Sequence, residues 1–147
     1  GYKNITCYPQ ALSDQIGTNT IFVSSGRSTA TSSLLEPKQE LHPETTFSQQ
    51  IISTTTIDSW AQIHHIDHID FMWLDMQGGE LAALKAGEKI AGTAFAIYTE
   101  ISLQARYASN PLYHELKLWL ENQGFTEVYQ QLIKPTWGNA LFIKQRK

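Results

Sequence analysis

The sequence contains a single cysteine, Cys7, among its 147 residues. One thiol excludes an internal disulfide and fits a reducing compartment, so we expect a cytoplasmic protein. No apolar stretch approaches the ~20 residues that a membrane-spanning helix requires, so we expect no membrane span. The net charge of −3 at pH 7 argues against a nucleic-acid partner, because such proteins need a basic face.

Glycine-rich loops are also absent. The nine glycines are scattered, and the only adjacent pair is Gly78-Gly79. The sequence contains no P-loop, no G-x-S-x-G nucleophile elbow and no C-x-x-C pair. These absences exclude phosphate cradling by a P-loop, hydrolysis by a nucleophile-elbow serine and dithiol redox chemistry.

The remaining composition is that of a folded domain. Hydrophobic residues make up 41% and charged residues 17% of the chain, which is ordinary for a globular protein. The length matches one domain, since domains cluster at ~100–150 residues. We therefore expect a single domain over residues 1–147.

In the first third of the chain, β-branched and aromatic residues predict short strands. We expect one strand over Asn4–Leu12 and a second over Thr20–Ser24, antiparallel to the first. Ser25–Gln50 is rich in Ser, Thr, Gln, Pro and Gly, which predicts a long loop. A short strand is expected over Ile51–Ile57.

Beyond residue 57 the pattern alternates between helices and strands. Asp58 is a candidate N-cap for a helix over Ser59–His64. The expected elements that follow are strand Phe71–Leu74, helix Glu80–Ile90, strand Phe95–Ile101, helix Leu112–Asn122 and a hairpin of strands Phe125–Gln131 and Ala140–Gln145. The apolar residues of the Leu112–Asn122 segment recur at helical spacing, and Gly124 follows as a C-terminal stop signal.

The most informative segment is FMWLDMQGGELAALKAGEKI, residues 71–90. An apolar strand ends on a carboxylate, Asp75, and a tight turn through Gln77-Gly78-Gly79 leads into a helix that Glu80 opens. In an open α/β sheet the carboxyl ends of parallel strands face the ligand crevice. A charged residue at that position is costly unless it is paired or used.

This segment resembles the strand-four signature of the FkbM-type methyltransferases, S-adenosylmethionine-dependent enzymes that methylate hydroxyls. Several other stretches resemble family elements in the family's order: ALSD (11–14), Gly17, SSLLEP (32–37), TTTIDSWA (54–61), AIYTEIS (96–102) and LYHELKLWLENQGF (112–125). The resemblance therefore covers most of the chain.

The resemblance implies an α/β, Rossmann-like class I methyltransferase fold with a mostly parallel sheet and a C-terminal antiparallel hairpin. It also implies a D-x-G-x-N-x-G type loop and a second acidic strand end that hold the cofactor, and neither occurs here. We therefore expect an N-terminally truncated domain that lacks its first two βα units and binds S-adenosylmethionine weakly or not at all. Such a truncation would expose a strand edge, so we also expect self-association.

The candidate catalytic residues are three carboxylates, each with a structural alternative. Asp75 is a candidate general base, or else a cap for the helix that follows. Glu80 faces the same crevice mouth, but a carboxylate in a first helical turn is also favoured by the helix dipole. Glu100 lies in an apolar strand, where a charge must be paired or face a ligand.

The candidate cofactor contacts implied by the resemblance are Ala11, Leu12, Asp75 and Met76. Arg106-Tyr107 follows the fifth expected strand, so this pair could close over an acceptor, although Arg106 could equally be a surface ion-pair partner.

Histidines at 64, 65 and 68 invite a metal hypothesis, because His64 and His68 would share a helix face. Ile63, Ile66 and Ile69 recur in the same segment and favour another interpretation. In that interpretation the isoleucines contact the core and the histidines are solvated, so we expect no metal site.

Two functions remain open from the sequence. The first is an O-methyltransferase that uses S-adenosylmethionine and acts on a hydroxyl of a sugar or another small molecule. The second is a non-catalytic α/β module that binds a partner or completes a sheet. Methyl transfer depends mainly on alignment of acceptor, methyl group and sulfur, so one carboxylate at a strand end is a sufficient base.

Overall fold

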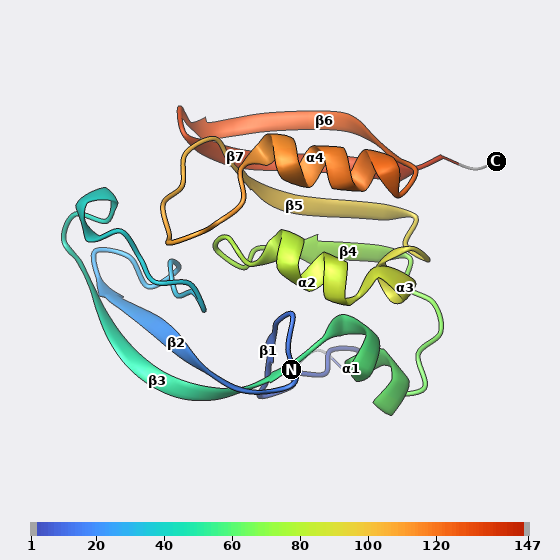
Figure 1. Cartoon of the computed structure of the whole chain (residues 1–147), viewed down its shortest axis with the longest axis horizontal. Helices are drawn as coiled ribbons and strands as arrows, with labels where there is room; N and C mark the ends of the chain where they lie inside the picture. Colours follow the sequence, from blue (N-terminus) through green and yellow to red (C-terminus); the bar gives the residue numbers. More distant parts are fainter. Residues whose placement is uncertain (1–2, 146–147) are drawn as a thin grey trace.

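A computed structural model of the chain describes residues 3–145. It contains two sheets, with strand orders β1-β3-β2 and β4-β5-β7-β6 (Figure 1). The strands are β1 (Ala11–Leu12), β2 (Gly17–Gly26), β3 (Thr45–Thr55), β4 (Phe71–Leu74), β5 (Ala96–Ser102), β6 (Phe125–Lys134) and β7 (Trp137–Lys144). The helices are the 3-10 helix η1 (Gln39–Leu41) and the α-helices α1 (Ile57–Ile63), α2 (Glu80–Ala86), α3 (Glu88–Ala91) and α4 (Tyr113–Asn122).

The first sheet is dominated by a long antiparallel ribbon of β2 and β3, paired from Gly17↔Thr54 to Gly26↔Thr45. The expected loop over Ser25–Gln50 is therefore wrong at both ends, since β3 begins at Thr45 and β2 ends at Gly26. Most residues of this ribbon are exposed or half-buried. Polar residues are consequently tolerated on both faces of the ribbon. For this reason the polar composition of the sequence predicted a loop where β3 begins.

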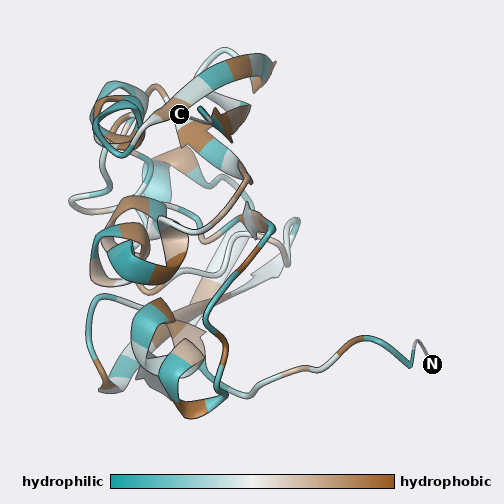
Figure 2. Cartoon of the chain, turned by 90° about the vertical axis from the view of Figure 1, so that its right-hand side faces the viewer, coloured by the Kyte–Doolittle hydropathy of each residue, from teal (hydrophilic) through white to brown (hydrophobic). Residues whose placement is uncertain are grey.

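The expected strand over Asn4–Leu12 is also largely wrong. Only Ala11 and Leu12 are in a strand, which pairs in parallel with Thr54 and Thr55 of β3. The segment before β1 is exposed and extends away from the sheets (Figure 2). Because β2 pairs with β3, the expected antiparallel pairing of the second strand with the first is wrong as well.

In the second sheet, β4 and β5 are parallel, whereas β7 is antiparallel to both β5 and β6. The α/β class and the closing antiparallel hairpin are confirmed. The expected mostly parallel sheet is wrong, because both sheets are mixed and only β1–β3 and β4–β5 are parallel among the strand pairs of residues 3–145.

The helices lie close to their expected positions, but two details differ. The Oγ1 of Thr56, rather than Asp58, caps α1 by accepting a hydrogen bond from the backbone N–H of Ser59 at 3.1 Å. The helix expected over Glu80–Ile90 is divided at Gly87 into α2 and α3. A Cβ at Gly87 would lie 2.4 Å from the Cβ of Ile57, so close packing against α1 requires glycine there.

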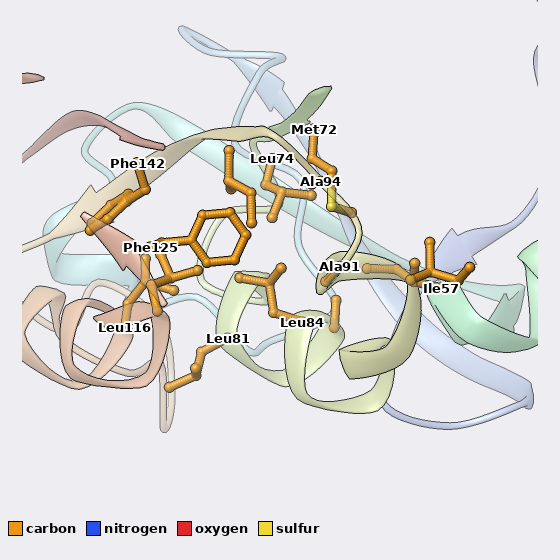
Figure 3. Packing of buried hydrophobic residues seen from close by; sticks show 14 of the residues in the cluster. Ile57, Met72, Leu74, Leu81, Leu84, Ala91, Ala94, Leu116, Phe125 and Phe142 are labelled. Carbon is orange, nitrogen blue, oxygen red and sulfur yellow. The ribbon is translucent and has the colours of Figure 1, made fainter. Parts of the chain in front are cut away.

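The four α-helices of the described residues lie on the same side of the molecule (Figures 1 and 2). None of them covers the opposite face of the second sheet. The hydrophobic core fills the space between the helices and the second sheet. Figure 3 shows Leu84 of α2 directed toward Leu74, and Leu116 of α4 beside Phe125. On the opposite face, Phe71 is 52% and Trp73 is 70% exposed.

Within residues 3–145, no helix has the length and apolar character needed to cross a membrane.

Candidate functional site

The candidate site is built on the turn that connects β4 to α2. Asp75 follows the last residue of β4 and is exposed. Two residues of the turn after Met76, Gln77 (φ 53°) and Gly78 (φ 100°), have left-handed backbone conformations. Glycine is required at 78 for a second reason, because a Cβ there would lie 2.7 Å from the Cβ of Asn110. The loop after β5 therefore lies directly against this turn.

Glu80 holds the turn in shape. Its Oε1 accepts a hydrogen bond from the backbone N–H of Met76 at 2.7 Å, and its Oε2 accepts one from Gly78 at 3.0 Å. Glu80 is only 5% exposed. No side chain caps α2 at Gly79, and Asp75 accepts instead from the side chain of Gln77. The alternative role of Asp75 as a helix cap is therefore wrong, and Glu80 performs the structural task at this turn.

The structure brings the three predicted carboxylates together at this turn, and Gln77 bridges two of them, Asp75 and Glu100. The side-chain Nε2 of Gln77 donates to Asp75 Oδ1 at 2.7 Å and to Glu100 Oε2 at 2.8 Å. Each of the two amide hydrogens therefore has an acceptor. Residues 75, 77 and 80 belong to one turn, and Glu100 comes from the neighbouring parallel strand β5. We call Asp75, Gln77, Glu80 and Glu100 the carboxylate cluster.

Burial changes the proton affinity of two members of the cluster. It raises the pKa of Glu80 to about 7, although the backbone N–H donors to Glu80 oppose this rise. The pKa of Glu100 is raised to about 8. Burial is the largest cause of this rise, and the negative charges of Glu80 and Asp75 add to it. At neutral pH Glu100 is therefore mostly protonated, whereas Asp75 is in contact with solvent.

The residues around Gln77 come from segments far apart in the sequence. The hydroxyl of Tyr107 lies 3.0 Å from Gln77 Oε1 and 3.0 Å from the carbonyl oxygen of Thr31. The hydroxyl of Ser33 donates to the carbonyl oxygen of Gln77 at 2.9 Å. Sequence reasoning did not identify Gln77 as a bridging residue, because its two acceptors come together only in the fold.

Arg106 lies near the carboxylate cluster, where its positive charge lowers the pKa of Glu100. Its guanidinium lies over the ring of Trp137, 5.6 Å from the centroid. Its carbonyl oxygen accepts a hydrogen bond from the backbone N–H of Lys38 at 3.0 Å. The Arg106-Tyr107 pair thus joins the loop after β5 to the segment between β2 and β3.

An apolar cavity of about 250 Å³ adjoins the turn. Ala11, Leu12, Met76 and Gly79 line it, together with residues of the segment that begins at Ser32. Three of the four predicted cofactor contacts therefore meet at one cavity, whereas Asp75 precedes Met76 outside its lining. The cavity and the carboxylate cluster are adjacent, since Glu80 binds the backbone of Met76.

The histidine segment does not have the arrangement that the metal hypothesis requires. Helix α1 ends at Ile63, so His64 and His68 do not share a helix face. His64 packs against Tyr8 and Trp60, and His68 Nε2 is hydrogen-bonded to Asp70 Oδ1 at 2.8 Å. Residues 3–145 contain no cluster of three or more His, Cys, Asp or Glu side chains suited to a metal ion.

The isoleucines of the same segment follow the expected pattern only in part. Ile66 and Ile69 pack against the core, whereas Ile63 is 69% exposed.

The chain is thus an α/β domain with an apolar cavity beside a carboxylate cluster at the end of a strand. The methyltransferase FkbM domain matches residues 1–127. The chain belongs to this family, as the sequence resemblance predicted. No curated protein and no solved structure matches it.

Proposed function

We propose that this chain is an S-adenosylmethionine-dependent O-methyltransferase domain that acts on a hydroxyl of a sugar or another small molecule. The observation that carries the proposal is the adjacency of the apolar cavity to an exposed strand-end carboxylate, Asp75. A methyl donor bound on one side of the β4–α2 turn would then be close to a group that can bind the acceptor. Membership of the FkbM family supports the same reaction class.

The cavity suits the flat heteroaromatic part of the cofactor. Its lining by Ala11, Leu12, Met76 and Gly79 is mainly apolar, as expected for a pocket that encloses an adenine ring. When bound, S-adenosylmethionine supplies an activated methyl group on its sulfonium. The chain has no glycine-rich loop to approach the remainder of the cofactor, so we propose weak binding by these residues alone.

On the acceptor side, Asp75 is the residue that can accept the hydroxyl proton. Its carboxylate is exposed, and the amide of Gln77 fixes one of its oxygens. Glu100 is mostly protonated below pH 8 because burial raises its pKa, which limits the negative charge around Asp75. A positioned base contributes about 10²–10⁴-fold to such a reaction, and alignment of the reacting atoms contributes the larger part.

Cofactor binding is tested by NMR titration of the chain with S-adenosylmethionine and, separately, with adenosine and guanosine. We expect weak affinity, with a Kd on the order of 1 mM, about −4 kcal/mol. The shifted resonances should include the methyl groups of Ala11, Leu12 and Met76. Micromolar affinity, or shifts confined to a region far from these three residues, would contradict the proposed pocket.

Replacement of Asp75 tests the catalytic assignment. We expect Asp75→Asn to lower kcat for methyl transfer to polyhydroxylated acceptors by about 10²–10⁴-fold, with little change in cofactor affinity or Tm. Asp67→Asn, at another exposed aspartate, is the matched control and should retain full turnover. Unchanged turnover in Asp75→Asn together with a lower Tm would assign Asp75 a structural role only.

A further inference from the structure

We propose that Tyr107 is a positioning residue that acts through Gln77 to orient the carboxylates of Asp75 and Glu100 toward the acceptor. This inference rests on the proposed methyl-transfer function and goes beyond it by assigning a role to a residue outside the β4–α2 turn. The observation that carries it is a continuous hydrogen-bond chain from the Tyr107 hydroxyl through the Gln77 amide to both carboxylates.

The orientation of the Gln77 amide depends on both ends of its side chain. Nε2 lies 2.7 and 2.8 Å from its two carboxylate acceptors, and Oε1 lies 3.0 Å from the Tyr107 hydroxyl. Gln77 is buried at 7% exposure, and an unpaired buried carbonyl oxygen carries a desolvation penalty. Without the hydroxyl, the amide gains free energy by rotating to find another donor for Oε1. Such a rotation weakens its donation to Glu100 and Asp75.

The backbone of Gln77 increases this dependence. Its left-handed conformation (φ 53°) is unfavourable for a non-glycine residue and persists only where the surroundings hold it. Ser33 holds the carbonyl oxygen, and Tyr107 holds the side chain. Both contacts come from outside the turn, so the turn depends on two other segments for its geometry.

Tyr107 is itself firmly fixed, which a positioning residue requires. It is 2% exposed, and its backbone N–H donates to Asn110 Oδ1 at 3.0 Å. Its hydroxyl also lies 3.0 Å from the carbonyl oxygen of Thr31. Its backbone forms an isolated antiparallel β-bridge with Pro37. The single hydroxyl proton is shared between two acceptors, the carbonyl oxygen of Thr31 and Gln77 Oε1. The hydroxyl therefore lies between the β2–β3 connection and the β4–α2 turn and links both to the β5–α4 loop.

The test is a titration of the Glu100 carboxyl carbon by NMR in four proteins: the parent chain, Tyr107→Phe, Gln77→Leu and the double variant. The charged and titratable groups that face Glu100 are Asp75, Glu80, Arg106 and Tyr107. Because the Gln77 amide lowers the pKa of Glu100, we expect both single variants to raise it, with the larger rise in Gln77→Leu. In the Gln77→Leu background, Tyr107→Phe should have no further effect.

A matched control is Tyr129→Phe, at an exposed tyrosine whose hydroxyl donates to Gln131 Oε1, and it should leave the Glu100 titration unchanged. An unchanged titration in Tyr107→Phe, or an equal shift with and without Gln77, would overturn the proposal. This measurement needs no cofactor and is therefore independent of whether the chain transfers methyl groups.

Kinetics then test the consequence for catalysis. We expect Tyr107→Phe to lower kcat by roughly 10-fold to 100-fold, the effect of a small misplacement of reacting groups, while KM for S-adenosylmethionine stays the same. If Asp75→Asn loses activity and Tyr107→Phe does not, the positioning role is overturned and the proposed function stands. If no protein transfers methyl groups although the titrations are coupled through Gln77, the proposed function fails and the positioning of the carboxylates stands.

Discussion

At the scale of single residues, the main feature is that two carboxyl groups, Glu80 and Glu100, are buried within one hydrogen-bond network. Their pKa values are raised to about 7 and about 8, mainly by burial. Each carboxyl therefore holds its proton more tightly in the folded chain than in the unfolded chain. By linkage, these groups stabilise the fold at low pH, and that contribution is lost as the pH rises.

The raised pKa values of Glu80 and Glu100 make the stability of the fold depend on pH. The unfolded carboxyl groups lose their protons near pH 4.5 and the folded groups near pH 7 to 8, so stability should fall between about pH 5 and pH 8. We expect Glu100→Gln to flatten this fall and to raise Tm at pH 8 by roughly 5 °C. Calorimetry from pH 5 to pH 8 measures both effects. Glu40→Gln, at an exposed glutamate, is the control, and an equally steep profile in Glu100→Gln would contradict the assignment.

The sequence predicted the three carboxylates but not what joins them. Asp75 and Glu100 follow or occupy apolar strands, where an acidic residue is conspicuous in the sequence. Gln77 is an ordinary turn residue in the sequence, and its function depends on Glu100 from β5 and Tyr107 from the next loop. Contacts between distant segments have no local signature.

At the scale of secondary-structure elements, α3 depends on a cap from another helix. The carboxylate of Asp58 in α1 accepts hydrogen bonds from the backbone N–H groups of Lys89 and Ile90, at 3.3 and 2.9 Å. The sequence suggested Asp58 as a cap for its own helix, because a local rule considers only the residues that follow. The fold uses the same side chain to close the N-terminus of a helix about 30 residues further along the chain.

We expect Asp58→Ala to destabilise the domain by about 1 kcal/mol, the usual cost of losing a helix N-cap. Urea denaturation measures the free energy of unfolding. Asp67→Ala, at an exposed aspartate in the same region, is the control and should have an effect close to zero. Equal effects of the two substitutions would show that the bonds from Asp58 do not stabilise α3.

At the scale of the whole molecule, local patterns predicted β4, β5 and the C-terminal hairpin, because apolar alternation and turn residues identify them. The division into two mixed sheets was not predictable in the same way. It results from the pairing of β2 with β3 across a connection of 18 residues, Arg27 to Glu44. The residues of that ribbon are polar enough to resemble a loop.

The open edge of the second sheet predicts self-association. β4 lies at the end of the order β4-β5-β7-β6, and an edge strand with exposed apolar side chains is a template for pairing with another chain. We expect concentration-dependent association in sedimentation velocity, and we expect Trp73→Lys to reduce it. Leu118→Lys, at a leucine of α4 that is 59% exposed, is the control. A monomer at all concentrations up to the solubility limit would contradict this expectation.

The hydrophobic core lies mainly between the helices and the second sheet, and this determines which part of the chain unfolds locally at the lowest free energy. Among the described residues, the buried apolar cluster begins at Ile57 and extends to Phe142, and β1 contributes only the partly buried Leu12. The β2–β3 ribbon is therefore held mainly by its own backbone ladder and by polar contacts such as that between Tyr107 and Thr31. Segments with few buried apolar contacts open at lower free energy than the core. Backbone amides of β2 and β3 should accordingly exchange with deuterium well before those of β5 and β7, so that the wall of the cavity opens while the helix-covered sheet remains folded.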